Sequence, residues 1–137
     1  MRWSFTIEGQ PISWNEAYKI GTGQRTGARG VLRLGRDGGP VEFRKIIKTE
    51  EAKTYTTLAM LRCREAKPSG WKPEGFVIVE FKYYLGRDVD CDNVMKLVND
   101  GIEDATGVDD RWYLPRAMWK TTGLRPGQRR IEVTIEG

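Results

Sequence analysis

Three aspartates stand at every second position near the middle of the chain: Asp88, Asp90 and Asp92. On an extended backbone, side chains two positions apart point to the same side and lie about 6.5 Å apart. Carboxylates that share a face repel one another unless a cation compensates their charge. Hard oxygen ligands of this kind suit Mg²⁺ or Mn²⁺ better than zinc. The spacing therefore predicts a divalent-metal site, with Mg²⁺ as the expected ion and Mn²⁺ as a substitute.

Asp92 also has a purely structural interpretation, as the N-cap of a helix predicted for residues 92 to 105. In that helix Asp92, Lys96 and Asp100 fall on one side, opposite an apolar side that begins with Val94 and Leu97. Lys96 is thereby directed back toward Asp92. Taken alone, such a pair is common on helix surfaces and contributes only a few tenths of a kcal/mol.

A second acidic pair, Asp109 and Asp110, precedes a strand predicted for residues 112 to 120. Acidic residues before a strand are most often turn formers, and that interpretation is favoured when the pair is considered alone. In combination with the first cluster, the pair predicts that three carboxylates and the Lys96 ammonium meet at one edge of a sheet.

Composition limits the chemistry that this chain could perform. There is no histidine, which excludes Ser-His and Cys-His nucleophiles and histidine metal sites. Two cysteines, Cys63 and Cys91, are too few for a disulfide framework or a zinc site. The net charge of +4 permits attraction to nucleic acid without establishing it. No apolar run could span a membrane and no secretion signal is apparent, so the cytoplasm is the expected location.

The order of predicted elements is β-α-β-α-β-β, which favours a single α+β (α/β) domain over residues 1–137 with a small mixed sheet of about four strands and two helices. Strands are expected at residues 2–8, 75–85, 112–120 and 130–135, and helices at residues 41–66 and 92–105. The 75–85 strand is rich in β-branched and aromatic residues and is expected to be central. Pro115 interrupts the third strand and predicts an edge position or a bulge.

Residues 21 to 40 are rich in glycine and arginine, and they are expected to form a basic loop. This loop is either a solvated insertion or an arm that contacts DNA phosphates. Its candidate phosphate contacts are Arg25, Arg29, Arg33 and Arg36, with Arg87 beside the acidic cluster as a fifth. Four tryptophans, Trp14, Trp71, Trp112 and Trp119, could stack on unpaired bases, although core or interface anchoring is the commoner role of this residue type.

The pattern Asp90-Cys91-Asp92-Asn93-Val94-Met95-Lys96, followed by Asp109-Asp110 and then Lys120, resembles the RusA family of Holliday junction resolvases. The similarity extends to Gly9-x-Pro11 and Asn15 near the N-terminus and to the C-terminal strand, and therefore covers most of the chain. Only the 21–40 loop looks added. Asp88 departs from the family pattern because it creates a second D-x-D.

The resemblance implies a homodimeric, Mg²⁺-dependent crossover junction endodeoxyribonuclease that makes paired nicks in four-way DNA junctions during recombination and repair, without a nucleotide cofactor and in a phage or prophage setting. It implies metal binding by Asp90, Asp92 and Asp110 and a catalytic role for Lys96. Accessory roles are open for Asp88, Asp100, Asp109 and Lys120. The alternatives are a nuclease acting on forks, flaps or other branched nucleic acid, and a noncatalytic DNA-binding module with the same fold. A third is a purely structural or interaction protein, in which the acidic residues would serve only as turn formers and helix caps.

Overall fold

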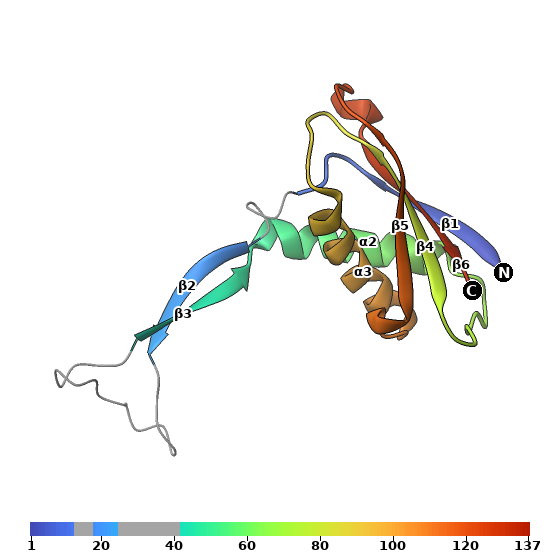
Figure 1. Ribbon diagram of the computed structural model, residues 1–137, viewed down its shortest axis with the longest axis horizontal. Helices are drawn as coiled ribbons and strands as arrows, with labels where there is room; N and C mark the ends of the chain where they lie inside the picture. The colour runs from blue at the N-terminus through green and yellow to red at the C-terminus, as the bar shows by residue number, and fades with distance from the viewer. Residues whose placement is uncertain (13–17, 25–41) are drawn as a thin grey trace, which may run out of the picture.

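The computed structural model describes residues 1–12, 18–24 and 42–137 (Figure 1), and for 18–24 and 42–48 it describes the backbone alone. Four strands form the main sheet in the order β1-β6-β4-β5. They are β1 (Arg2–Glu8), β4 (Val77–Tyr84), β5 (Tyr113–Thr121) and β6 (Arg130–Glu136). β6 pairs antiparallel with both β1 and β4, whereas β4 and β5 run parallel. The sheet is therefore mixed, as predicted, and β4 lies inside it.

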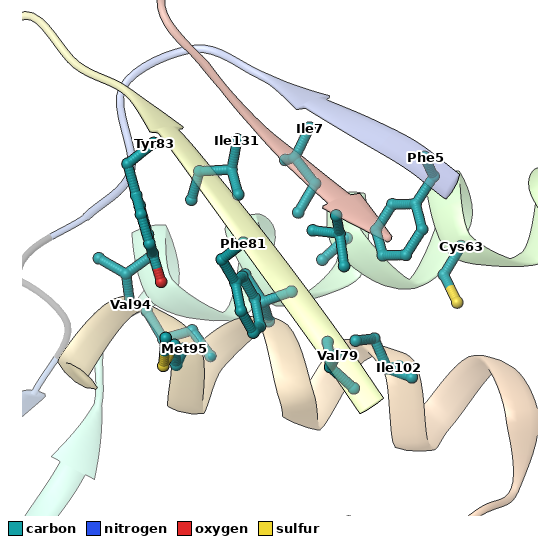
Figure 2. Close-up of a cluster of buried hydrophobic side chains, with 14 of the residues drawn as sticks. Phe5, Ile7, Cys63, Val79, Phe81, Tyr83, Val94, Met95, Ile102 and Ile131 are labelled. Atoms are coloured by element: carbon teal, nitrogen blue, oxygen red, sulfur yellow. The ribbon is translucent and has the colours of Figure 1, made fainter. Parts of the chain in front are cut away.

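Two helices, α2 (Glu50–Ala66) and α3 (Cys91–Thr106), cover one face of this sheet (Figure 1). Alternate residues of each covered strand point into the layer between sheet and helices, as the alternating burial of β1, β4 and β6 records. Figure 2 shows Phe81 and Tyr83 of β4 above Val94, Met95 and Ile102 of α3. Phe81 and Tyr83 are fully buried and stack with ring centroids 6.0 Å apart.

The two helices approach each other closely at Gly101 of α3. A Cβ atom at that position would lie 2.9 Å from the carbonyl oxygen of Thr56 and 2.9 Å from the Cβ of Ala59, both on α2. Only a residue without a side chain allows this contact. The close packing fixes α3 along the sheet, and with it the positions of both ends of the helix.

The region before α2 corrects the sequence prediction. Residues 41–48 were expected to begin a helix and residues 21–24 to belong to a loop, but β2 (Tyr18–Gln24) and β3 (Glu42–Lys48) form an antiparallel hairpin. Phe43, Ile46 and Ile47 favour a strand by residue type. The helix itself begins after Thr49, whose side-chain oxygen accepts a hydrogen bond of 3.3 Å from the backbone N–H of Ala52. The hairpin stands away from the main sheet (Figure 1).

Within the described residues, the order of elements is therefore β-β-β-α-β-α-β-β, with two short 3-10 turns, η2 (Asp110–Trp112) and η3 (Pro126–Gln128). The α+β class, the four-stranded mixed sheet and the two packed helices agree with the sequence prediction. Pro115 was predicted to lie in an edge strand or at a bulge, and it lies in β5, which is an edge strand. The pairing of β5 with β4 shifts register after Phe81. No helix in the described part of the chain is long and apolar enough to cross a membrane.

Candidate metal and nucleic-acid site

The acidic segment follows β4 directly and is anchored by residues around it. Gln10 holds the start of the segment, because its side chain accepts a 2.7 Å hydrogen bond from the Gly86 N–H and donates one of 3.2 Å to the Arg87 carbonyl. Tyr83 donates a 3.3 Å hydrogen bond to the carbonyl oxygen of Cys91 at the start of α3. Burial raises the pKa of the Tyr83 hydroxyl, so it remains a neutral donor.

Asp90, and not Asp92, is the N-cap of α3. Its carboxylate accepts a 3.0 Å hydrogen bond from the Asp92 N–H, and its backbone is extended while Asp92 already lies in the first helical turn. The predicted run of three aspartates on one extended strand is therefore wrong, because the chain turns into the helix at Cys91. Asp90 and Asp92 nevertheless remain exposed and adjacent at the N-terminal end of α3, where the helix dipole favours negative charge.

Asp88, which precedes that pair, is bound by Lys120 of β5. The two side chains form an ion pair, and the Lys120 ammonium also donates a 2.9 Å hydrogen bond to the carbonyl of Val89. The pairing of β4 with β5 explains the contact, since it places Lys120 beside Tyr83 at the end of β4. The hydrogen bond to Asp88 raises the pKa of Lys120. Lys120 thus ties the edge strand to the acidic segment.

Lys96 and Asp100 lie further along α3, as the helical spacing predicted. Lys96 is exposed one turn after Asp92, and Asp100 is half-buried one turn further on. The opposite side of the helix carries the buried residues Val94, Met95, Leu97, Val98, Gly101 and Ile102. Lys96 therefore lies on the exposed side of α3, one turn after Asp92, and Asp90 and Asp92 are exposed at the start of the same helix.

Asp109 and Asp110 lie at the opposite end of the sheet. The parallel register places Tyr113, three residues after Asp110, beside Val77 at the start of β4, whereas Asp90 follows the end of β4. α3 connects the two ends (Figure 1), and its 16 residues span about 24 Å. The prediction that Asp110 joins Asp90 and Asp92 at one edge of the sheet is therefore wrong within a single chain.

The sequence analysis did not anticipate the actual neighbour of Asp110, which is Glu103 on the last turn of α3. Partial burial, followed by the charges of Asp110 and Asp109, raises the pKa of Glu103. Asp109 also caps the η2 turn, since its carboxylate accepts a 3.0 Å hydrogen bond from the Arg111 N–H. Within the described residues, no group of three or more carboxylates or thiols is arranged to hold a metal ion. In one copy of the chain, the predicted metal ligands Asp90 and Asp92 thus lie at the start of α3, whereas Asp110 lies near its other end.

Between these two acidic ends runs β5, an edge strand with little cover. After buried Tyr113 its residues are exposed along almost their whole length, and they include Leu114, Met118 and Trp119. One edge of the strand is paired with β4, and the other has no neighbouring strand among residues 1–12, 18–24 and 42–137. A long apolar strand with an unpaired edge is a template for another strand.

The remaining predicted contacts are distributed as follows. Arg25, Arg29, Arg33 and Arg36, together with Trp14 and Asn15, lie outside the described residues, whereas Arg87 is exposed beside the acidic segment. Trp71 is a packing residue, because its ring contacts that of Trp3, with the ring centroids 5.3 Å apart, and its N–H donates to the Gly137 carbonyl.

No protein-family model matches the chain, and no curated protein matches it either.

Proposed function

We propose that the chain is a Mg²⁺-dependent endonuclease that cleaves branched DNA, with four-way junctions as the preferred substrate. The observation that carries the proposal is the start of α3, where the exposed carboxylates of Asp90 and Asp92 and the ammonium of Lys96 occur together beside the end of the sheet. A binding module gains nothing from uncompensated carboxylates facing phosphates, whereas a metal-dependent nuclease needs them.

Two carboxylates are a sparse ligand set for a catalytic magnesium ion, and Asp110 of the same chain is too far away. A second copy supplies it if the two β5 edges pair antiparallel about a two-fold axis. The start of one β5 then lies beside the end of the other, which brings Asp110 of one copy toward Asp90 and Asp92 of its partner. The exposed, apolar and unpaired β5 supports this arrangement. The proposed dimer has two such composite sites.

A divalent cation held in each composite site would activate a water molecule and neutralise charge on the scissile phosphate. Asp90 and Asp92 contribute ligands from a preorganised helix start, and Asp110 completes the set from the other copy. Lys96 stabilises the negative charge that develops on the phosphate. Lys120 fixes the acidic segment through Asp88 and the Val89 carbonyl, so its role is to position the ligands.

The test is cleavage of labelled four-way junctions, forks, flaps and linear duplexes in Mg²⁺ or EDTA, with Asp92→Asn beside the wild type. We expect paired, metal-dependent nicks at the junction, and no cleavage but retained DNA binding by Asp92→Asn. Cleavage that prefers forks or flaps would assign the same metal chemistry to another branched substrate. Undiminished cleavage by Asp92→Asn, or binding of DNA without cleavage by the wild type, would overturn the proposal.

A further inference from the structure

Two exposed aromatic rings stand next to Asp110, at the end of the sheet where β4 and β5 begin. Phe76 is 64% exposed and Trp112 is 38% exposed, and their ring centroids lie 5.4 Å apart. Phe76 comes from the segment that precedes β4, and Trp112 ends the η2 turn that Asp110 begins. Large aromatic side chains are normally buried, so a contacting pair left open to solvent calls for a ligand or partner.

The pair forms part of a hollowed surface. A hollow of about 390 Å³ is lined by Phe76, Arg111 and Trp112. A second hollow of about 380 Å³ borders Trp112 as well, with Lys72 and Asp109 among its lining residues. The Trp112 ring is therefore accessible from two sides. The Arg111 guanidinium carbon lies 5.5 Å from the centroid of the Trp112 ring, which adds a planar cation to the aromatic surface.

The backbone holds Trp112 in place without help from a ligand. The η2 turn is closed by a 3.1 Å hydrogen bond from the Trp112 N–H to the Asp109 carbonyl, in addition to the Asp109 cap. Two residues before Asp109, Gly107 caps the C-terminal end of α3 with a φ of 74°, a conformation that glycine adopts without strain. Asp110 and Trp112 thus sit at the two ends of one short turn.

We propose that Phe76 and Trp112 form a stacking platform for an unpaired nucleobase flanking the phosphate at the Asp110 site, with Arg111 and Lys72 contacting the neighbouring backbone phosphates. The proposal rests on the proposed function for its substrate class. Trp112 contacts a second exposed ring and a guanidinium, whereas Trp71 is packed against Trp3. Trp119 is 57% exposed on β5, and its N–H is bonded to Thr121. Base stacking would favour strands with exposed bases over intact duplex.

The experiment measures affinity in EDTA, where no cleavage occurs, for a single-stranded oligothymidylate and for an abasic strand of the same length. Both probes carry the same phosphates, so the ratio of their affinities isolates the bases. We expect the wild type to prefer the base-bearing strand by about tenfold, since stacking contributes about 1–3 kcal/mol per base. Phe76→Ala and Trp112→Leu should abolish the preference, whereas Trp112→Phe should keep most of it. Leu61→Ala, which shortens an exposed apolar side chain on α2, is the matched control and should keep it in full.

Equal affinity of the wild type for the two strands would overturn the proposal, as would a Trp112→Leu variant that keeps the full preference. Sedimentation of the Phe76→Ala variant supplies a second criterion. If the variant loses dimerisation and retains the base preference, the pair is a subunit contact and the proposal fails. Failure of the nuclease proposal is separately visible: a protein that never cleaves can still prefer the base-bearing strand.

Discussion

The two ends of α3 are both acidic, but the structure uses their carboxylates differently. At the N-terminal end, Asp90 caps the helix and lies beside Asp92, with the helix dipole favouring their charge. At the C-terminal end, Glu103 approaches Asp109 and Asp110, and its pKa is raised by partial burial and by their charges. The helix dipole favours negative charge at the first end, whereas the second end gathers several carboxylates, of which Asp109 pairs with Arg111 at 4.0 Å.

The contrast teaches that motif spacing does not specify which end of a sheet a residue occupies. β4 and β5 are parallel, so the chain must return along α3 to the end of the sheet where β4 began before β5 can start. Residues placed immediately before β5 therefore lie a full helix length from those that follow β4. If both acidic groups serve one metal, two copies are required, and the exposed β5 is the element available to join them.

The largest effect is expected from Asp110→Asn. In the composite site this change removes a ligand that Asp90 and Asp92 cannot replace, so junction cleavage should fall at least about a hundredfold, the loss associated with removing one charge-stabilising group. Cleavage rates on a labelled four-way junction provide the measurement. Asp104→Asn is the matched control, since it neutralises an exposed carboxylate at the same end of α3, and its rate should stay near that of the wild type. Full activity of Asp110→Asn would remove that end from the site.

A smaller effect, on dimerisation, is expected when a charged residue is introduced on the edge strand β5. Leu114 on β5 and Leu61 on α2 are each 44% exposed, so lysine at either position disturbs the monomer similarly. Leu114→Lys should weaken dimerisation at least about tenfold, because charged side chains on an edge strand oppose strand pairing. Leu61→Lys should leave it unchanged. Analytical ultracentrifugation over a concentration series measures both, and equal dimer stability for the two variants would contradict pairing through β5.

The smallest effect is on stability and concerns the helix that separates the two ends. Gly101→Ala places a methyl group 2.9 Å from the Thr56 carbonyl oxygen, so the free energy of unfolding should fall by about 1–3 kcal/mol. Gly127→Ala is the control, because its added Cβ meets nothing within 4 Å. Urea unfolding of the two variants makes the comparison. A Gly101→Ala protein as stable as the control would show that α2 and α3 are not packed as described.

Much of the fold could be predicted because local pattern and tertiary structure agree. The β-branched and aromatic residues of β4 indicated a buried strand, helical spacing separated Lys96 and Asp100 from the apolar side of α3, and Pro115 indicated an edge. The β2–β3 hairpin was missed because residues 41–48 precede a real helix and continue its apolar spacing for one more turn. Thr49, an N-cap residue type inside the helix predicted for residues 41–66, was the available signal.

The site was predicted less well, for reasons that lie beyond local sequence. Residue types identified Asp90, Asp92 and Asp110 as candidate ligands, but only strand direction separates them in space. Glu103 lies near Asp110, and Phe76 contacts Trp112, because α3 and the segment before β4 both reach the start of β5. No sequence motif predicts these contacts. The ion pair between Asp88 and Lys120 likewise follows from the register of β4 and β5.

The most direct test of the composite site mixes two inactive variants. Asp92→Asn and Asp110→Asn homodimers each lack one ligand in both sites, but a heterodimer of the two has one intact site and one site lacking both ligands. After subunit exchange at equal concentrations, half of the dimers are expected to be heterodimers, so about a quarter of all sites should be intact. Recovery of cleavage near that level is the predicted result. If the mixture stays as inactive as either variant alone, although exchange is demonstrated with differently labelled subunits, the three aspartates do not meet across a dimer.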